Sequence, residues 1–232
     1  MILAGGLGTR LSSLVSDRPK ALVEINRRPF LSYLFDQLES AGCRKVVLCT
    51  GYLGGAIRKK FGTRYKSLSL FYSRESVPRG TGGALRLALP LVKTKSILVM
   101  NGDSFCGASL TDFYLDYKDK KTKAAILLTR VPDARRYGKV SMDAKGRILR
   151  FLEKDSNARA GWINAGVYLL NRDLLRSIPA RKVVSLEKEM FPAWIEAGLY
   201  GHRVRARFLD IGTVESYNRA GHFFSKKKQD IL

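Results

Sequence analysis

Short runs of apolar residues alternate with segments of helical periodicity along the first hundred residues. Residues 45–50, 68–73 and 96–101 are rich in Val, Ile, Leu and Phe and have the length of buried strands. Segments 30–38 and 84–89 instead place apolar residues three and four positions apart, which predicts two helices. Strands that alternate with helices predict a mostly parallel sheet with helices on both faces.

The second half has a different pattern, with several short strand candidates and few helices between them. The candidate strands cover residues 124–130, 139–142, 148–152 and 166–170. Helical periodicity returns at 186–197 and 214–224. We therefore predict one α/β domain over residues 1–232, with a Rossmann-like, mixed but mostly parallel sheet. A ligand of such a sheet is expected outside the carboxyl ends of the strands.

The chain opens on a short apolar stretch, Met1–Ala4, that runs directly into two glycines. This stretch is too short for a secretion signal and has no basic residues before it. No apolar run along the chain approaches the ~20 residues that span a bilayer. We expect a short buried strand followed by a glycine turn, and no membrane partner.

The composition is strongly basic, with 42 Lys and Arg against 20 Asp and Glu and a formal charge of +22. Such a charge raises the question of nucleic-acid binding. The basic residues are, however, spread along the chain and are not interleaved with aromatic residues as in a base-stacking surface. We interpret the charge as a solvated basic surface that also attracts anionic substrates, and nucleic acid is not favoured as a partner.

Cysteine and histidine give no sign of a disulfide framework or a structural metal site. The three cysteines are odd in number and widely spaced, and the two histidines lack metal-ligand spacing. A reducing, cytoplasmic location is the simplest expectation. The oligomeric state is left open, a homo-oligomer included.

A glycine-rich turn follows the first strand. Leu3 and Ala4 lead into Gly5, Gly6, Gly8, Thr9 and Arg10, and Pro19 and Lys20 follow ten residues later. Glycines allow backbone N–H groups to approach phosphate oxygens, and a guanidinium, a hydroxyl and an ammonium add ligands for an anion. The turn lacks the Gly-Lys-Ser/Thr of a Walker A loop, and Leu11 replaces the third glycine of a dinucleotide fingerprint. It predicts a different type of phosphate site.

Three further positions have the residue types of a nucleotide and metal site. Gly80, Thr81 and Gly82 open a helix, where backbone groups can read a base and the helix N-terminus favours anions. Asp103 and Asp210 each follow an apolar run and lie next to a glycine, Gly102 or Gly212. Two carboxylates within about 8 Å of each other can share Mg²⁺ with substrate phosphates. The alternatives are a simple glycine turn and two turn-capping aspartates.

In these motifs the chain resembles the sugar-1-phosphate nucleotidylyltransferases, and within them is most similar to D-glycero-D-manno-heptose 1-phosphate and mannose-1-phosphate guanylyltransferases. The resemblance covers nearly the whole chain. It rests on five motifs in order: Gly5–Leu11 with Pro19-Lys20, Pro78–Ala84, Asn101-Gly102-Asp103, Phe151–Lys154 with Asn164–Tyr168, and Leu209–Thr213.

The resemblance implies that the two halves of the chain bind different substrates. Residues 1–120 would bind the nucleotide, through the first glycine loop, Lys20, the turn at 80–82 and Gly102. Residues 121–232 would bind the sugar phosphate, through Gly138, Glu153, Lys154 and Asn164. Arg10, Lys20 and Asp103 would act in catalysis, and Asp103 and Asp210 would hold Mg²⁺.

The activity implied is transfer of a nucleoside monophosphate, with GTP the expected donor, to heptose or mannose 1-phosphate with release of pyrophosphate. Enzymes of the same family that use dTTP, UTP or CTP with a hexose or amino-sugar 1-phosphate share the loop and stay open as alternatives. A glycosyltransferase would more typically carry Asp-x-Asp, but here Asp103-Ser104-Phe105 lacks the second carboxylate. A basic nucleic-acid-binding protein and a catalytically silent regulatory homologue are the remaining alternatives.

Overall fold

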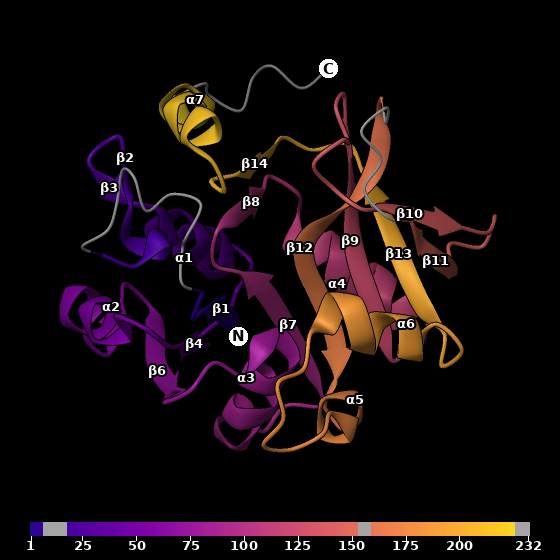
Figure 1. The fold of residues 1–232 in the computed structure, drawn as a ribbon, viewed down its shortest axis with the longest axis horizontal. Helices are drawn as coiled ribbons and strands as arrows, with labels where there is room; N and C mark the ends of the chain where they lie inside the picture. Colours follow the sequence, from indigo (N-terminus) through magenta and orange to yellow (C-terminus); the bar gives the residue numbers. More distant parts are fainter. Residues whose placement is uncertain (7–17, 153–158, 226–232) are drawn as a thin grey trace.

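The structure is a computed structural model, and it describes residues 1–6, 18–152 and 159–225. Its centre is one mixed sheet. The ten strands of this sheet are β1 (Ile2–Ala4), β4 (Lys45–Thr50), β5 (Arg64–Tyr65), β6 (Leu68–Arg74), β7 (Ser96–Asn101), β9 (Ala124–Val131), β10 (Lys139–Met142), β11 (Ile148–Leu152), β12 (Gly161–Asn171) and β13 (Leu199–Val204). The strand order is β11-β10-β12-β7-β1-β4-β6-β5; in addition, β9 pairs with β12, and β13 pairs with β9 (Figure 1).

The direction of the strands changes between the two halves of the chain. Strands β6, β4, β1 and β7 pair in parallel, as the alternation of strands and helices predicts. The long strand β12 then pairs antiparallel with β9 along one edge, and with β7 and β10 at different positions along the other. The first half is therefore a parallel nucleotide-binding type of sheet, and β12 joins the second half to it without a break.

Helices cover both faces of the sheet (Figure 1). They are α1 (Phe30–Ser40), α2 (Gly54–Phe61), α3 (Gly80–Ala88), α4 (Leu110–Asp119), α5 (Arg172–Ser177), α6 (Phe191–Trp194) and α7 (Val214–Ser225). Successive side chains of β4 show the two faces: Val46 and Leu48 join the core of α1, α2 and α4, whereas Val47 and Cys49 join the core of α3, α5 and α6. The predicted fold class is confirmed.

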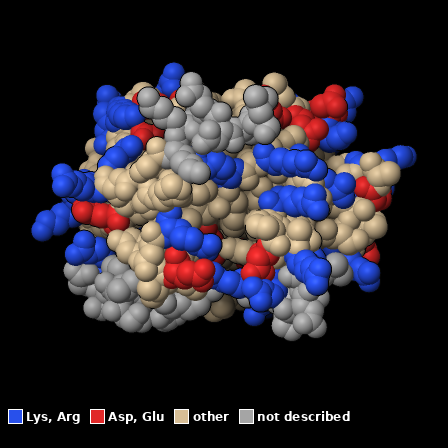
Figure 2. All heavy atoms as spheres, turned by 90° about the horizontal axis from the view of Figure 1, so that it is seen from above, with Lys and Arg blue, Asp and Glu red and all other residues tan. Residues whose placement is uncertain are grey.

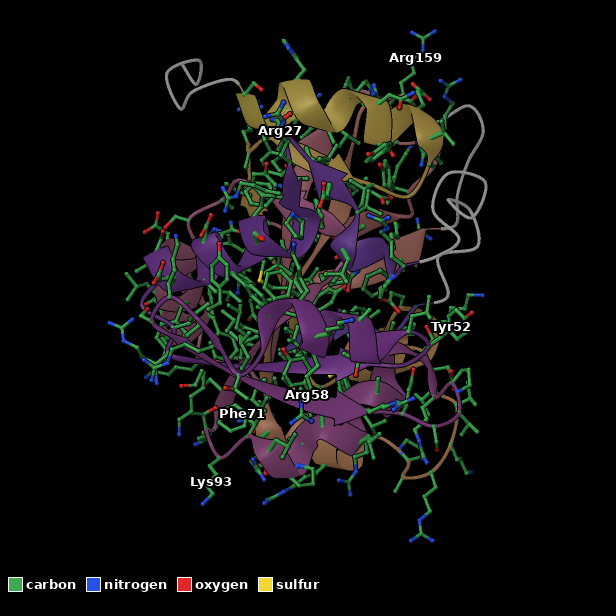
Figure 3. The ribbon with its side chains drawn as sticks, turned by 90° about the vertical axis from the view of Figure 1, so that its left-hand side faces the viewer. Arg27, Tyr52, Arg58, Phe71, Lys93 and Arg159 are labelled. Carbon is green, nitrogen blue, oxygen red and sulfur yellow. The ribbon has the colours of Figure 1, made fainter. Side chains whose placement is uncertain are left out.

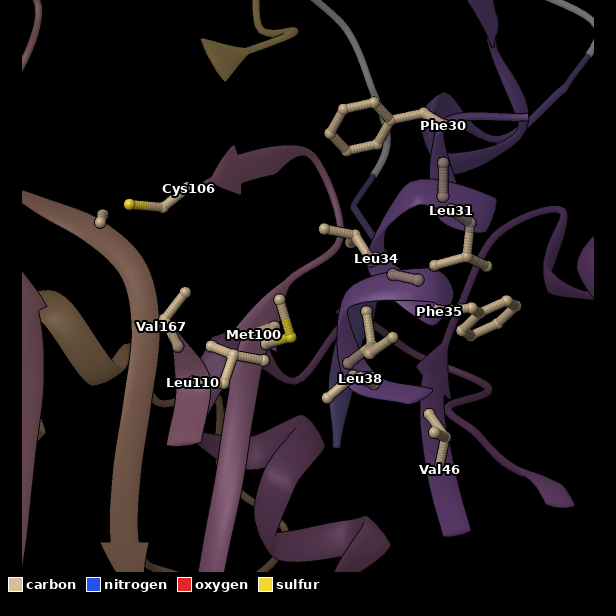
Figure 4. Packing of buried hydrophobic residues seen from close by; sticks show 14 of the residues in the cluster. Phe30, Leu31, Leu34, Phe35, Leu38, Val46, Met100, Cys106, Leu110 and Val167 are labelled. Atoms are coloured by element: carbon tan, nitrogen blue, oxygen red, sulfur yellow. The ribbon is translucent and has the colours of Figure 1, made fainter. Parts of the chain in front are cut away.

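The first of these cores holds most of the large buried side chains. Phe30, Leu31, Leu34, Phe35 and Leu38 form one stripe of α1 and are at most 4% exposed. Figure 4 shows them packed beside the side chains of β4 and β7. Burial of five such residues fixes α1 against the sheet, since each contributes about 1.5–3 kcal/mol of transfer free energy.

Some predicted elements differ from the structure. The helix predicted at 186–197 is instead a π-helical turn η4 (Leu186–Met190) followed by the one-turn helix α6. The two pieces are contiguous, so the backbone is helical from Leu186 to Trp194 and ends three residues before the predicted end. Helix α3 begins four residues before the predicted start, at Gly80, and strand β12 extends over eleven residues, beyond the predicted 166–170. Helices α2, α4 and α5 were not predicted.

Two short strands lie outside the main sheet, near the carboxyl end of β7. Strand β8 (Ser104–Cys106) pairs antiparallel with β14 (Phe208–Asp210), and Asp210 lies opposite Ser104. Helix α7 follows β14 and packs Phe224 on Tyr33, with ring centroids 3.8 Å apart. This small sheet brings residues from the middle of the chain and from near its C-terminal end to the same place.

Candidate active site

The two aspartates predicted to share a cation lie on neighbouring chain segments. Asp103 follows β7 and Gly102, and Asp210 ends β14. The N–H of Ile211 donates to the carbonyl oxygen of Asp103 at 3.0 Å, so the two backbones are in direct contact. Residues 107 positions apart in the sequence are thus brought together by the β8–β14 pairing.

Lys20 lies between these two carboxylates. Its Nζ is 2.7 Å from Oδ2 of Asp103 and 3.9 Å from Oδ1 of Asp210. Two contacts with one nitrogen keep these oxygens within about 7 Å of each other, inside the roughly 8 Å expected for a shared ion. The Lys20 side chain is 13% exposed, so this ion pair is partly shielded from water. Sequence reasoning placed Lys20 with the phosphates and did not foresee its contact with the aspartates.

Burial shifts the pKa of Asp210. Its pKa is raised, first by desolvation and then by the negative charge of Asp103, while Lys20 opposes the shift. A Cβ at Gly212 would lie 2.7 Å from Oδ1 of Asp210, so only glycine lets this turn close over the carboxylate. A buried carboxylate next to a second one favours a cation between them.

The donor set fits a hard divalent cation bound together with substrate. Within the described parts of the chain, no group of three or more His, Cys, Asp or Glu residues converges on one point. Two carboxylates are nevertheless enough for Mg²⁺, which takes one or two protein carboxylates and completes its shell with phosphate oxygens and water. Asp103 and Asp210 are the residues that would hold it.

The glycine turn lies at the same edge of the sheet. Leu3 and Ala4 belong to β1, and the N–H of Gly102 donates to the carbonyl oxygen of Leu3 at 2.8 Å. A Cβ at Gly5 would meet the backbone N of Gly51 at 3.2 Å, whereas a Cβ at Gly6 would meet nothing within 4 Å. The predicted residues Gly8, Thr9 and Arg10 lie outside the described residues.

The glycines at 80 and 82 have a packing role that the sequence did not reveal. Gly80 has a φ of +70°, and a Cβ there would come within 2.5 Å of the carbonyl oxygen of Val184. The N–H of Gly82 donates to that same oxygen at 2.8 Å. The hydroxyl of Thr81 donates to Glu187 and accepts from the N–H of Leu186, each at 2.8 Å. The first turn of α3 is therefore anchored to the segment before α6.

Glu75 is a residue of this edge that the sequence analysis missed. It follows β6, and its Oε2 accepts a hydrogen bond from the N–H of Arg79 at 3.0 Å. A Cβ at Gly5 or at Gly51 would lie 2.9 Å from its Oε1, so the carboxylate packs against both glycines. Burial raises the pKa of Glu75. The signal available in the sequence was a carboxylate directly after a strand, the same signal that identified Asp103.

The structure describes two of the four residues predicted to bind the sugar phosphate, Gly138 and Asn164. Gly138 precedes β10 and follows Tyr137, whose ring meets that of Phe208 on β14 at 5.7 Å. Asn164 lies on β12 at an irregularity opposite the end of β7. Glu153 and Lys154 lie outside the described residues. The structure therefore brings Lys20, Asp103, Asp210 and the β1 turn together, with Asn164 on the strand next to β7.

The chain matches the sequence profile of the nucleotidyl transferase family over residues 1–227. It is 34% identical to the D-glycero-alpha-D-manno-heptose 1-phosphate guanylyltransferase of Aneurinibacillus thermoaerophilus, over 95% of each chain. It is 33% identical to the mannose-1-phosphate guanylyltransferase of Mycobacterium tuberculosis, over 94% of this chain and 62% of that longer protein.

Solved structures of nucleotidyltransferases have the same fold. The crystal structure of HddC from Yersinia pseudotuberculosis complexed with GMP-PN superposes with a TM-score of 0.86 at 31% identity, over 96% of this chain and 97% of the other. A putative glucose-1-phosphate thymidylyltransferase from Bacillus anthracis shares the fold, with a TM-score of 0.85 at 22% identity. No helix among the described residues is long and apolar enough to span a membrane.

Proposed function

The chain belongs to the nucleotidyl transferase family, and on this premise we propose that it transfers a guanylyl group from GTP to a heptose or mannose 1-phosphate. The single observation that carries the proposal is the contact of Lys20 with both Asp103 and Asp210 at the edge of the sheet that holds the β1 glycine turn. Relatives named as guanylyltransferases of these two sugars support the choice of substrates.

The reaction joins two polyanions, so the main obstacle is electrostatic repulsion. An oxygen of the sugar phosphate attacks the α-phosphorus of GTP, a new P–O bond forms, and the bond to the β-phosphate oxygen breaks to release pyrophosphate. Because the nucleophile is already ionised, no general base is needed. Positioning and charge neutralisation supply the catalysis.

Each charged residue has a role in this scheme. Lys20, with Arg10 from the glycine turn, neutralises the triphosphate and the leaving pyrophosphate, and Lys154 holds the attacking phosphate. Asp103 and Asp210 would hold Mg²⁺, which when bound neutralises phosphate oxygens and aligns them. Glu153, Asn164 and the backbone of Gly138 orient the sugar. Residues 1–120 thus serve the nucleotide, and residues 121–232 serve the sugar phosphate.

Glu75 supports guanine as the base. The Watson–Crick edge of guanine presents two adjacent donors, N1–H and N2–H₂, and a carboxylate accepts two such bonds at once. Thymine and uracil present one N–H between two carbonyl oxygens, which would face the carboxylate unfavourably. The backbone of Gly80–Gly83 is the second proposed base contact. Discrimination of this kind reaches several kcal/mol when a mismatched polar group stays unpaired.

Reducing conditions are also part of the proposal. All three cysteines are free, and burial raises the pKa of Cys49 to about 12 and that of Cys106 to about 11. Such thiols stay protonated and unreactive at neutral pH. The proposed cytoplasmic location rests on the three cysteines being free thiols and not on these pKa values.

The experiment that tests the proposal is a matrix of GTP, dTTP, UTP and CTP against heptose, mannose, glucose and N-acetylglucosamine 1-phosphates, with pyrophosphate release as the readout. We expect the highest kcat/KM with GTP and a manno-configured sugar. Equal or better turnover with another triphosphate would refute the guanylyl assignment. Salt-sensitive DNA binding without pyrophosphate release would favour the nucleic-acid alternative.

A further inference from the structure

Strand β12 carries a β-bulge beside the candidate site. Its pairing with β9 shifts register between Asn164 and Tyr168, and Gly166 within the bulge has a φ of +73°. The N–H of Gly166 donates to Oδ1 of Asn164 at 2.8 Å. A bulge re-aims the side chains next to it, and bulges are frequent beside active sites.

The hydroxyl of Tyr168 is the second fixed contact of the Asn164 amide. Nδ2 of Asn164 donates to this hydroxyl oxygen at 3.0 Å, and the Tyr168 side chain is fully buried. Its ring meets that of Phe191 edge-on at 4.9 Å, which holds the phenol in place from the other side. Burial raises the pKa of Tyr168 well above its usual value, so the hydroxyl stays neutral.

Tyr168 also contacts the strand that leads to Asp103. Tyr168 lies opposite Val99 of β7, two residues before Asn101, the last residue of that strand. The bulge and this strand end are packed closely, because a Cβ at Gly166 would lie 2.6 Å from Oγ of Ser104 and 3.0 Å from Nδ2 of Asn101. The Tyr168 hydroxyl therefore holds Asn164 from a residue that pairs with β7, the strand that leads to Asp103.

The Asn164 side-chain amide has hydrogen-bonding groups left over for a ligand. The amide has two N–H donors and two lone pairs on its oxygen. One donor is held by Tyr168 and one lone pair by the N–H of Gly166. These two bonds fix which end of the amide is oxygen and which is nitrogen, and they leave one donor and one lone pair for a sugar hydroxyl.

We propose that Tyr168 is a positioning residue for the sugar phosphate: its hydroxyl fixes the orientation of Asn164 relative to the β7 strand end. This inference rests on the proposed function, in which Asn164 binds the sugar. Without the phenol oxygen, the amide can turn, and the sugar loses an oriented partner before GTP is affected. Tyr168 itself does not touch the substrate.

The test is Tyr168→Phe, with Tyr117→Phe as the matched control. Tyr117 is also buried, at 4% exposure, but lies on α4 in the other core. We expect Tyr168→Phe to raise the KM for mannose 1-phosphate about five- to tenfold, the effect of one net hydrogen bond, with the KM for GTP within twofold of wild type. Tyr117→Phe should leave both KM values unchanged.

The double variant separates positioning from loss of stability. Tyr168→Phe in an Asn164→Ala background should add less than twofold to the KM for the sugar phosphate, because the amide it positions is gone. A lower Tm with unchanged KM, or an equal rise in both KM values, would overturn the inference while leaving the proposed function intact. Sugar-phosphate affinity is also measured by calorimetry with GTP absent and present. If wild type binds no sugar phosphate and releases no pyrophosphate, both proposals fail.

Discussion

At the scale of single residues, the site is a balance of buried charges. Lys20 compensates Asp103 directly and Asp210 more distantly. Asp210 is the less well compensated of the two, since burial and its neighbour together raise its pKa. Its ionised form therefore costs folding free energy at neutral pH, and that cost is removed when the group is protonated.

Asp210→Asn is expected to abolish activity and to raise stability. With a raised pKa in the folded state, Asp210 favours folding below its unfolded pKa, and this contribution is lost as the pH rises through the folded value. We expect a higher Tm than wild type at pH 7 and a smaller difference below about pH 4. kcat should fall by orders of magnitude. Thermal unfolding across pH and single-turnover assays measure the two effects.

Asp103→Asn provides the companion measurement. It should lower kcat to a similar extent, and the double variant should be little worse than either single one, because both carboxylates serve one ion. Full additivity of the two losses would show that the carboxylates act separately. Circular dichroism of each variant checks that the fold is intact.

Glu75→Gln is expected to change the base preference. An amide offers one acceptor and one donor, which suits the N–H and carbonyl oxygen of uracil or thymine better than the two donors of guanine. We expect kcat/KM for GTP to fall about 10- to 100-fold and that for UTP or dTTP to rise relative to it. A variant that keeps the wild-type ratio of GTP to UTP turnover would remove Glu75 from base recognition.

Lys154→Ala addresses a residue outside the described part of the chain. A charge-assisted hydrogen bond to phosphate is worth about 1.5–3 kcal/mol, so the KM for the sugar phosphate should rise roughly 10- to 100-fold. The affinity for GTP should change little. Lys120→Ala, an exposed lysine after α4, is the matched control. Wild-type sugar-phosphate kinetics in Lys154→Ala would make Lys154 a surface residue.

At the scale of elements, the sequence predicted the strands of the parallel half well because each is a short apolar run, which in β4 is buried on both faces. Helix α1 was equally clear, since its apolar stripe is unbroken. Helices α2 and α4 were missed because basic and acidic residues interrupt their apolar stripes, as in Arg58–Lys60. The predicted helix at 186–197 is present over Leu186–Trp194, but periodicity did not show that its first part is π-helical or that it ends three residues early.

The residues of the candidate site could likewise be predicted only where the signal is local in the sequence. Glycines and carboxylates at strand ends can be recognised from local sequence, which is why Gly5, Gly6 and Asp103 could be proposed as site residues. Contacts across long sequence separations were not predictable, such as Lys20 with Asp103 and Thr81 with Glu187. The glycines of α3 were assigned to a ligand, and the structure shows that they also accommodate the backbone of Val184.

Gly80→Ala tests how much the anchor of α3 contributes. A side chain at a φ of +70° costs about 1–2 kcal/mol, and its Cβ would clash with Val184. We expect the free energy of unfolding to fall by about 2–4 kcal/mol and the KM for GTP to rise. Gly55→Ala in α2 is the control, because nothing lies within 4 Å of its Cβ and alanine favours a helix. Equal stability of the two variants in urea titrations would contradict the anchor.

At the scale of the whole molecule, the charge of +22 surrounds a site for two polyanions. Figure 2 shows Lys and Arg side chains over the face that carries α7 and β14, and Figure 3 shows Arg159 and Lys93 projecting at opposite ends. Such a field raises the local concentration of anionic substrates and speeds their association.

The KM for GTP is therefore expected to depend on salt. Between 50 and 500 mM KCl the Debye length falls from about 14 to about 4 Å, and the long-range attraction is screened. We expect KM to rise several-fold with a smaller change in kcat, measured at constant free Mg²⁺. A KM independent of KCl would show that the surface charge has no part in substrate capture.

The position of strand β12 in the sequence affects how the chain folds during its synthesis. It is made late, at Gly161–Asn171, yet it covers the edge of β7 and supports β9 and β10. Until it leaves the ribosome, the finished parallel half has an uncovered strand edge, which other chains can join. The two halves share one sheet and do not form separate folding units, so synthesis must pass residue 171 before the edge of β7 is covered.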